Sequence, residues 1–298
     1  MSLIFVMVDG VGLADAGPHN PVASGMPRLT SLLGVPLEAA FDIQSAGLLA
    51  RPIDASLGVD GLPQSGSGHS TIYGGFNAAV FNGRHQPSYP TIAMRERLAR
   101  RNLFSAAREA GYRVAWANVY LPGYAEAVER RRMRHTAGTW SALQSGLPLR
   151  GLAELTAGRA VSWDITQTLA RRRPDCDDLP LISPAAASQR LVCLAGEHDL
   201  VGFETYLPDL AGHGRLALSP QEALVLVDGF LAGIVTGKRP EDTLIVTSDH
   251  GNVEDIRTRV HTRNPVPLIA VGPAAAVFGR VSAIDGLLEA MIEGLGHA

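Results

Sequence analysis

The 298-residue sequence predicts an α/β fold in which the strands of the sheet are buried on both faces. Apolar runs of strand length recur along the chain and are continuous rather than alternating, as is typical of such strands. Segments with helical start signals lie between these runs. Acidic and histidine residues follow several of the runs, and in α/β proteins the functional groups gather where the strands end.

Six apolar runs bounded by turn residues are predicted to be strands. They are Leu3–Val8, Ala46–Ala50, Val114–Val119, Leu191–Leu194, Leu244–Thr247 and Pro267–Val271. Helices are predicted where a capping signal precedes an apolar period. The clearest capping signal is the box Ser219-Pro220-Gln221-Glu222 before Ala223–Ile234. Two further helices are expected, one that Ser183-Pro184 opens before the run at Leu191 and one over Asn102–Gly111 before the run at Val114.

The segment 122–180 is the least sheet-like part of the chain, and we expect it to form an inserted, arginine-rich cap. The arginines are concentrated in Glu129–His135 and Arg171–Pro180. Residues 1–121 and 181–298 would then form the α/β core. The length agrees with this division, because roughly 150 residues per domain allow about two domains or one large unit with an insertion.

Composition excludes several classes of protein. Hydrophobic residues make up 46% and charged residues 18%, which allows a sizeable core and excludes a disordered chain. The first residues have no basic stretch before Asp9, which favours a buried strand over a signal peptide. No apolar run is long enough to span a bilayer, and Cys176 and Cys193 are too few for a disulfide framework. We therefore expect a soluble, cytoplasmic protein, and the sequence leaves its oligomeric state open.

The charge of the chain is unevenly distributed. Residues 79–189 contain sixteen arginines, no lysine and nine carboxylates, a balance of +7, whereas the rest has ten basic and twenty acidic residues, a balance of −10. A nucleic-acid-binding protein usually has a net positive charge, so this pattern argues against such a partner. An acidic core beside a basic segment suits a metal site that receives an anionic substrate. The alternative is that most of these arginines are simply solvated.

Three aspartates and three histidines stand at or near the ends of predicted strands. They are Asp9, Asp209, His213, Asp249, His250 and His261. A mixed set of carboxylate and imidazole ligands suits Mn²⁺ or Zn²⁺. Six ligands are too many for one tetrahedral site and about right for two adjacent metals. A single Asp or His at a strand end is more often a cap, but six of them in four short motifs favour a metal centre.

A nucleophile is expected in the small, glycine-rich stretch from Leu62 to Thr71, which opens a predicted helix. Backbone N–H groups of such a stretch can approach an anion closely. A serine there becomes nucleophilic when a metal binds its oxygen. By itself the stretch could equally be a plain linker, and the neighbouring ligand set is what favours the catalytic interpretation.

Five motifs occur in a recognisable order: Val-Asp-Gly-Val-Gly at 8–12, Gln-Ser-Gly-Ser-Gly-His at 64–69, Asp-Leu-Ala-Gly-His at 209–213, Ser-Asp-His-Gly-Asn at 248–252 and His-Thr-Arg-Asn-Pro-Val-Pro at 261–267. They resemble the motifs of the alkaline phosphatase superfamily, in its cofactor-independent phosphoglycerate mutase and phosphopentomutase branch. The chain is also similar to short bacterial members of this branch that are known only as metalloenzymes. The resemblance implies an alkaline-phosphatase-like fold, with a mixed, mostly parallel sheet flanked by helices and a small inserted cap.

The resemblance also implies how the site residues divide. Asp9, Ser65, Asp249 and His250 would hold one metal ion, and the remaining ligands, Asp209, His213 and His261, would hold the other. Ser65 stands where the mutases have their phosphorylated residue, four positions before His69. Ser67 and Thr71 are the alternative nucleophiles.

Departures from the pattern bear on the substrate. The inserted segment is much shorter than the domain that grips phosphoglycerate in the mutases. The residue after the nucleophile is Gly66 where the mutases have Glu, and Ser70-Thr71 stand where phosphopentomutases have Trp-Glu. The fold and the metal chemistry therefore transfer better than the named mutase activities.

The predicted function is phosphoryl transfer on a small phosphorylated metabolite, through a phosphoserine at Ser65 and two Mn or Zn ions. A phosphatase-type hydrolase is the first expectation, and a phosphomutase or a sulfate or phosphonate ester hydrolase are the alternatives. A non-catalytic metal protein is disfavoured, because all seven ligand positions are filled. Arginines bind phosphate in a bidentate manner, and the expected substrate-binding residues are Arg84, Arg130, Arg134, Arg159 and Arg263. His85 and His135 are possible general acids.

Overall fold

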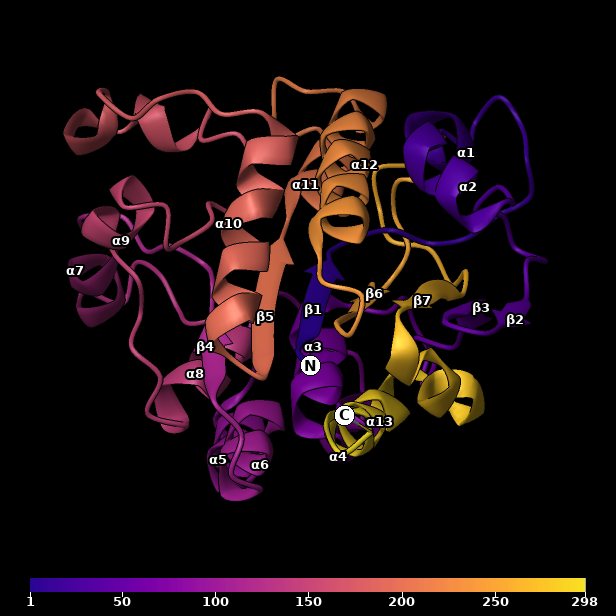
Figure 1. The fold of residues 1–298 in the computed structure, drawn as a ribbon, viewed down its shortest axis with the longest axis horizontal. Helices are drawn as coiled ribbons and strands as arrows, with labels where there is room; N and C mark the ends of the chain where they lie inside the picture. Colours follow the sequence, from indigo (N-terminus) through magenta and orange to yellow (C-terminus); the bar gives the residue numbers. More distant parts are fainter. Residues whose placement is uncertain (298) are drawn as a thin grey trace.

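The computed structural model describes residues 1–297 and contains a seven-stranded sheet with the order β2-β3-β7-β6-β1-β5-β4 (Figure 1). The strands are β1 (Leu3–Val8), β2 (Ile43–Ser45), β3 (Leu48–Ile53), β4 (Val114–Trp116), β5 (Leu200–Thr205), β6 (Thr243–Thr247) and β7 (Val266–Val271). Strand β1 is in the middle and pairs in parallel with β5 and β6, and β4 adds to β5 in parallel. Strands β7, β3 and β2 then follow β6 in antiparallel succession.

The predicted α/β class with a mixed sheet is confirmed. Only β7 and β2 run against the other five strands, and three of the six pairings between neighbours are parallel. The register aligns Val8 at the end of β1 with Thr205 of β5, and Met7 with Thr247 of β6. The residues that follow these three strands therefore meet at one edge of the sheet.

Helices cover both faces of the sheet. On one face lie α1 (Val22–Gly25), α2 (Pro27–Leu33), α10 (Pro184–Glu197) and α12 (Pro220–Gly237). On the other lie α3 (Ser65–Gly74), α5 (Ile92–Arg100), α6 (Leu103–Glu109), α8 (Ala137–Gln144) and α13 (Leu287–Leu295). The shorter elements are α4 (Ala78–Asn82), α7 (Tyr124–Glu129), α9 (Leu152–Thr156), α11 (Leu207–Gly212) and the 3-10 turns Ala170–Arg172, Pro174–Cys176, Pro273–Arg280 and Ile284–Gly286.

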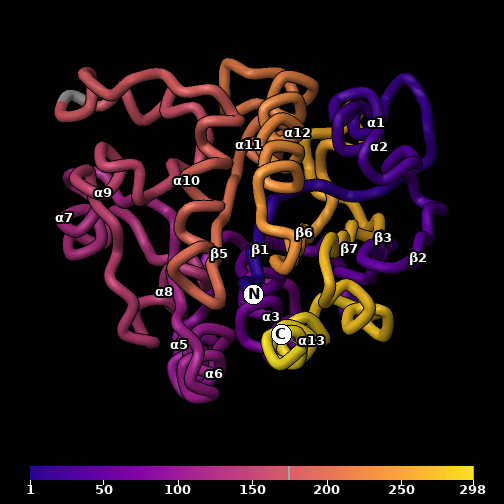
Figure 2. Tube along the Cα trace, viewed as in Figure 1, coloured from indigo at the N-terminus to yellow at the C-terminus, as the bar shows by residue number. Residues whose placement is uncertain are grey.

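The segment 122–180 extends beyond the β4 edge, and α7 and α9 lie at the left of Figures 1 and 2. It has an apolar cluster of its own, formed by Val119, Leu155, Ala160, Ala170, Cys176 and Leu179. Helix α8, in contrast, packs against α3, α5 and α6 in the helical layer of the main core. The division into a core and a cap at 122–180 stays a prediction, and α8 is the part of the segment that joins the core.

One predicted strand is wrong. Leu191–Leu194 lies inside helix α10, and the strand that follows is β5. Leu191 and Leu194 are buried against the sheet because they are three residues apart on one face of a helix that starts at the Ser183 cap. The true strand was hidden by Gly202 and Glu204, which interrupt its apolar run.

Other predicted elements are confirmed, with shifts at their ends. The predicted run Ala46–Ala50 covers the turn between β2 and β3 and the first residues of β3. Strand β3 itself begins at Leu48 and continues to Ile53. Helix α12 has the predicted capping box, in which the Ser219 side chain accepts from the Glu222 N–H. None of the helices within residues 1–297 is both long and apolar enough to cross a membrane.

Phe230 on α12 tests how strongly the two layers depend on their packing. It is fully buried, and its ring lies 5.2 Å from that of Phe203 on β5. We expect Phe230→Ala to lower the free energy of unfolding by about 3–5 kcal/mol, because the substitution leaves a cavity between helix and sheet. Val225→Ala on the same helix, where Val225 is 43% exposed, should change it by less than about 0.5 kcal/mol in the same denaturant titration. Equal effects would contradict this account of the core.

Candidate metal centre

The strand ends of the central sheet bring acidic and histidine side chains together in its interior. Asp9 follows β1, Asp249 and His250 follow β6, and Asp209 lies on α11 directly after β5. All four are buried. The parallel pairing of β1 with both neighbours places these loops side by side, as the sequence predicted.

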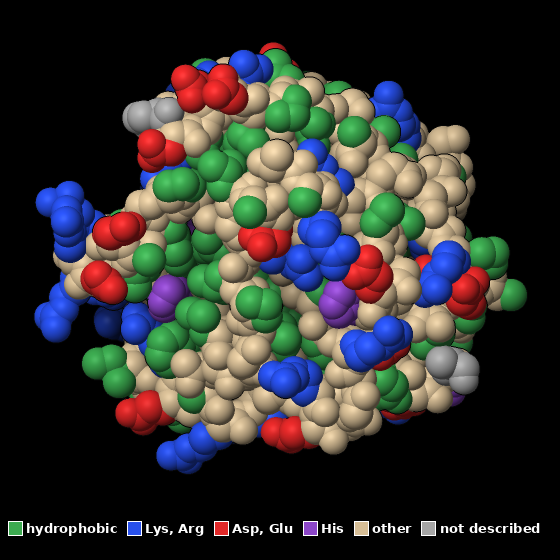
Figure 3. Space-filling model, turned by 60° about the vertical axis from the view of Figure 1, so that its left-hand side comes forward, with side chains coloured by type: hydrophobic (Ala, Val, Ile, Leu, Met, Phe, Trp, Pro, Cys, Tyr) green, Lys and Arg blue, Asp and Glu red, His purple; other side chains and the backbone are tan. Residues whose placement is uncertain are grey.

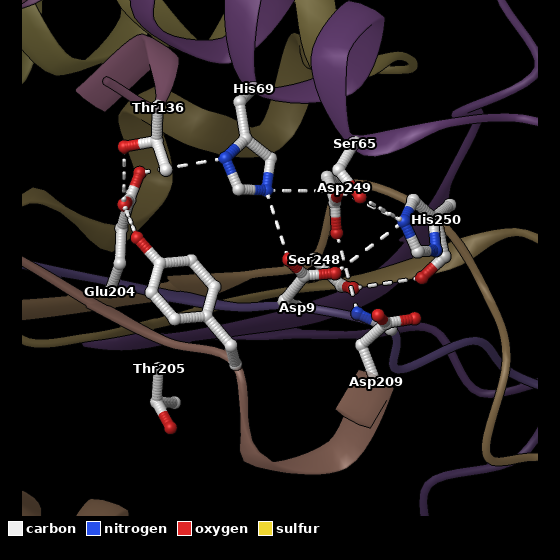
Figure 4. Close-up of polar contacts among 12 residues, drawn as sticks. Asp9, Ser65, His69, Thr136, Glu204, Thr205, Asp209, Ser248, Asp249 and His250 are labelled. Atoms are coloured by element: carbon white, nitrogen blue, oxygen red, sulfur yellow. Dashed lines mark hydrogen bonds and ion pairs between the residues drawn. The ribbon is translucent and has the colours of Figure 1, made fainter. Parts of the chain in front are cut away.

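The first group consists of Asp9, Asp249 and His250, which offer three ligand atoms within 4.8 Å of one another. His250 Nε2 lies 3.4 Å from Asp9 Oδ1 and 3.1 Å from Asp249 Oδ2. Ser65, the first residue of α3, places its Oγ 3.0 Å from the same nitrogen. Figure 4 shows Ser65 projecting from the helix toward Asp249 and His250. The structure thus assembles the four residues that were predicted to form one site.

The second group consists of Asp209, His213 and His261. Nδ1 of His213 lies 2.7 Å from the Arg259 carbonyl oxygen, and Nδ1 of His261 lies 2.7 Å from that of Pro63. Because a carbonyl oxygen only accepts, Nδ1 carries a proton in both rings, and Nε2 is the nitrogen whose lone pair can bind a cation.

These two Nε2 atoms point at one place. They are 3.0 Å apart, and they lie 3.3 and 3.4 Å from Asp209 Oδ1. Two lone pairs and a carboxylate oxygen facing one point repel one another unless a positive charge lies among them. This donor set fits a divalent cation, and the nitrogen and oxygen ligands suit Zn²⁺ or Mn²⁺.

The first group has the same deficit of positive charge. Burial, together with the carboxylates of Asp249 and Asp209, raises the pKa of Asp9 well above its ordinary value. Burial also lowers the pKa of His250 to about 4, so this imidazole is neutral near pH 7. Asp9 Oδ1 is buried without a hydrogen bond to any residue in 1–297. Buried, unpaired carboxylate oxygens are costly in the absence of a counter-charge, and a bound cation would remove that cost.

His69 and Glu204 belong to the site, and the sequence gave them no role. His69 Nε2 lies 3.0 Å from Asp249 Oδ2 and 3.3 Å from Asp9 Oδ2, while its Nδ1 faces Glu204 Oε1 at 3.7 Å. Burial opposes a charge on this ring, but Asp249 and Asp9 raise the pKa of His69 well above its ordinary value. His69 is therefore a built-in cation between the first group and Glu204 (Figure 4).

Asn252 and Glu254 are two further residues that the sequence did not identify. Asn252 donates to Asp209 Oδ1 at 2.8 Å and so orients this carboxylate. Glu254 is almost fully buried and accepts from the backbone N–H groups of Gly12 and Asn252 at 3.0 and 2.8 Å, which fixes the loops after β1 and β6. Both lie within five residues of Asp249, and their closeness to this motif was the only signal in the sequence.

The glycines of the nucleophile stretch permit close packing. A Cβ on Gly68 would lie 2.8 Å from Asp249 Cβ and 2.9 Å from the Asp249 carbonyl oxygen. Gly10, after Asp9, has φ +77°, and a Cβ there would lie 2.7 Å from Asp209 Cβ. Because these positions lack a side chain, α3 and the β1 loop can approach the ligand carboxylates closely.

Comparison with known proteins shows which families the chain and its fold are similar to. A family model described as the metalloenzyme superfamily matches residues 185–291. The fold resembles a cold-active alkaline phosphatase from Shewanella sp. with a TM-score of 0.58, 14% identity and coverage of 99% of this chain and 100% of that one. The fold also resembles alkaline phosphatase from the Antarctic bacterium TAB5, with a TM-score of 0.56, 12% identity and coverage of 100% of this chain and 98% of that one. Residues 185–291 thus match the metalloenzyme superfamily, and the fold of the whole chain is alkaline-phosphatase-like.

Within this superfamily the chain is distantly similar to cofactor-independent phosphoglycerate mutases. The 2,3-bisphosphoglycerate-independent phosphoglycerate mutase from Roseobacter denitrificans is 30% identical over 195 residues, which cover 55% of this chain and 38% of the relative. The mutase of the same description from Halobacterium salinarum is 33% identical over 132 residues, which cover 41% of this chain and 26% of the relative. The matched parts span less than half of these relatives' own length.

A cavity of about 490 Å³ opens beside the two groups and is lined by Asp9, Ser65, His69 and Asp209 together with residues of 118–134 and 162–173. Of the five predicted substrate arginines, Arg134 lines it, whereas Arg84, Arg130, Arg159 and Arg263 are absent from its lining. Arg159 forms an exposed ion pair with Glu197, and Arg263 donates to the Gly61 carbonyl. Arg173 and Arg215, which the sequence did not single out, also line the cavity.

The alternative nucleophiles and the two histidines that could act as acids lie outside this lining. Ser67 is fully buried and donates to the Gln64 carbonyl, and Thr71 accepts from the Ala78 N–H. His85 faces the Val59 carbonyl at 3.3 Å, and His135 is bonded to the Tyr124 hydroxyl at 2.8 Å. Of the predicted nucleophiles, Ser65 is thus the one that lines the cavity.

Metal binding should stabilise the fold. After chelation, addition of Mn²⁺ or Zn²⁺ at about 100 times its Kd should raise the free energy of unfolding by about 2.7 kcal/mol for each site, because only the folded chain assembles the ligands. We expect elemental analysis to find two ions per chain and one ion in His213→Ala. Less than one tightly held ion in the reconstituted protein would contradict the two-site assignment.

Gly68→Ala tests the close approach of α3 to Asp249. The added methyl group has no room beside the Asp249 backbone, so we expect a loss of stability of about 1–3 kcal/mol and at least about tenfold weaker metal binding. Gly196→Ala is a matched control, because Gly196 lies in a helix with open space around it. That variant should be neutral or slightly stabilised. Calorimetric metal titration of both variants measures their affinities for the metal. Equal stability and equal metal affinity of the two variants would disprove the packing argument.

Proposed function

We propose that the protein transfers phosphoryl groups from a small phosphate monoester through a phosphoserine at Ser65, with two divalent ions, Mn or Zn, in the groups described above. The observation that best supports this is the position of Ser65 Oγ, 3.0 Å from His250 Nε2 and on the wall of a cavity that also reaches Asp9 and Asp209. A hydroxyl that lies beside a cation site and lines a substrate-sized cavity is the arrangement that a phosphoryl acceptor requires.

The chain's own residues orient the acceptor. Helix α3 begins at Ser65, and packing of Gly68 against Asp249 fixes the distance of this helix from the ligand loops. His250 is neutral near pH 7, so its Nε2 can hold a cation or accept the hydrogen bond of the Ser65 hydroxyl. Two divalent ions here would lower the pKa of this hydroxyl and neutralise the charge of the transferring group.

The reaction then consists of two displacements. In the first, the bond between Ser65 Oγ and phosphorus forms while the bond from phosphorus to the alcohol oxygen of the substrate breaks. In the second, water attacks the phosphoserine, inorganic phosphate leaves and the serine hydroxyl is restored. A mutase would instead return the phosphoryl group to a second hydroxyl of the same substrate.

Hydrolysis is the better supported of these two outcomes. A mutase must hold the dephosphorylated intermediate and keep water out while it turns. Four of the five predicted substrate arginines lie outside the cavity, and the three arginines that line it are exposed. Such a site grips the product weakly and admits water, which favours release of free phosphate.

Ser65→Ala tests the nucleophile. We expect at least about a thousandfold loss of turnover of a phosphate monoester, because the covalent step is removed. Phosphorus NMR of the manganese-loaded protein should show inorganic phosphate growing for the wild type, and intact mass after rapid quenching should show a phosphorylated chain. Metal content must be measured in parallel, since Ser65 is also a predicted ligand.

Ser67→Ala is the matched control, because Ser67 lies in the same turn of α3 but outside the cavity. It should still form the phosphorylated chain. Full turnover by Ser65→Ala would overturn the assignment, as would phosphorylation lost only in Ser67→Ala. A new ester signal without free phosphate would establish a mutase in place of a hydrolase.

A further inference from the structure

We infer that the organic part of the substrate is a flat aromatic ring, held against an aromatic wall of the cavity that begins beside Ser65. This inference rests on the proposed function and adds the class of the alcohol. The wall consists of Tyr120, Tyr124, Trp163 and Tyr206, all of which line the cavity and all of which are half-buried or partly exposed. They come from the segments after β4 and β5, from α7 and from the loop before Ala170.

The wall is continuous with the metal centre. The Tyr206 ring stacks on His69 with centroids 6.3 Å apart and planes at 14°, and His69 in turn contacts Asp9 at 3.3 Å. The ring centroid of Trp163 lies 5.9 Å from that of Tyr206. A ring attached to a phosphate at Ser65 would therefore meet these aromatic faces directly.

The tyrosines present their rings to the cavity, because their hydroxyl groups are engaged elsewhere. The Tyr206 hydroxyl is bonded to Glu204 Oε2 at 2.5 Å and the Tyr124 hydroxyl to His135 at 2.8 Å. The Tyr120 hydroxyl accepts from Trp116 Nε1 at 2.7 Å and lies 2.7 Å from Thr139 Oγ1. A sugar or glycerol chain would find few free hydrogen-bonding groups along this wall.

Burial also keeps the wall uncharged. It raises the pKa of Tyr120, Tyr124 and Tyr206 above their ordinary values, so all three are neutral at any working pH. Neutral rings attract the face or edge of another ring and do not repel a phosphate. The ring centroids of Tyr120 and Tyr124 lie 4.7 Å apart, so these two rings form a second aromatic pair in the wall.

The position of Trp163 is built into the backbone. Thr205 Oγ1 donates to its carbonyl oxygen at 2.7 Å. The turn that follows holds Ile165 at φ +61° and Gln167 at φ +66°, conformations that side-chain-bearing residues rarely adopt. Asp164 Oδ2 accepts from the Leu169 N–H across this turn. Backbone strain of this kind is retained where the position of a side chain matters.

The charged residues that line the cavity are few. They are Asp9, His69 and Asp209 beside the metal groups and the exposed arginines Arg134, Arg173 and Arg215. None of these three arginines forms an ion pair with a residue in 1–297, although other exposed arginines such as Arg101 and Arg113 do. Figure 3 shows basic side chains beside hydrophobic ones on this side of the molecule. Unpaired arginines would attract an anionic substrate without contacting its ring.

The test compares three esters whose leaving groups are all simple alcohols: benzyl phosphate, cyclohexylmethyl phosphate and glycerol phosphate. For the metal-loaded protein we expect kcat/KM for benzyl phosphate to exceed each of the others by about 10–100-fold, as stacking on one or two rings provides. In Tyr124→Ala this preference should fall at least fivefold, whereas Tyr124→Phe, which keeps the ring, should retain it. Equal kcat/KM for the three esters would overturn the inference and leave the proposed function standing.

A binding measurement separates the two failures. Benzylphosphonate cannot be hydrolysed, and it should quench tryptophan fluorescence of the metal-loaded protein with a Kd at least tenfold below that of methylphosphonate. Trp163→Phe should abolish most of this signal, because Trp163 lines the cavity. If no ester is turned over but this difference persists, the proposed function fails and the ring site stands. Equal binding of both phosphonates, or none, overturns the ring site.

Discussion

The structure depends on one electrostatic constraint, which is that several carboxylates are buried together at the end of the central strands. Asp9, Asp209 and Asp249 lie within one cluster, and Glu204 is buried close to them. Carboxylates in an apolar interior repel one another and lose their hydration, so they persist only where positive charge is supplied. His69 supplies positive charge on the side that faces Glu204. On the opposite side, each of the two ligand groups has donor atoms that converge on a point where a cation could bind. The proposed catalysis and the stability of the fold therefore depend on the same group of buried residues.

The sheet makes this cluster possible. Parallel pairing of β1 with β5 and β6 brings three loops from distant parts of the sequence to one edge, and the two helical layers bury that edge. Close packing then sets the distances. Gly68 and Gly10 let a helix and a loop approach the ligand carboxylates as a Cβ-bearing residue could not. Glu254 and Asn252 complete the arrangement by fixing the loops from behind.

Strand-end chemistry made the ligand groups predictable from the sequence, because Asp9, Asp249 and His250 directly follow apolar runs whose ends meet in any parallel sheet. The role of Glu204 was not predictable in this way. It lies within a strand that the sequence analysis misplaced, and its partners Tyr206, Thr136 and His69 become neighbours only through the fold. The set of arginines that line the cavity did not follow from the sequence for a similar reason. Their long side chains reach the cavity or miss it according to the path of 122–180, which local patterns do not encode.

Glu204 links the metal centre to the substrate cavity. Its Oε1 faces His69, which contacts two of the carboxylates, while its Oε2 accepts the Tyr206 hydroxyl and lies 3.5 Å from Thr136 Oγ1. Thr136 and Tyr120 meet at the Thr139 hydroxyl, so both sides of the aromatic wall are tied to one buried carboxylate. These shared hydrogen bonds restrict the positions of the residues on both sides of the wall. Glu204 therefore positions both the rings that would receive the alcohol and the residues that would hold the phosphate. This role explains a carboxylate inside strand β5, where an apolar residue would pack at lower cost.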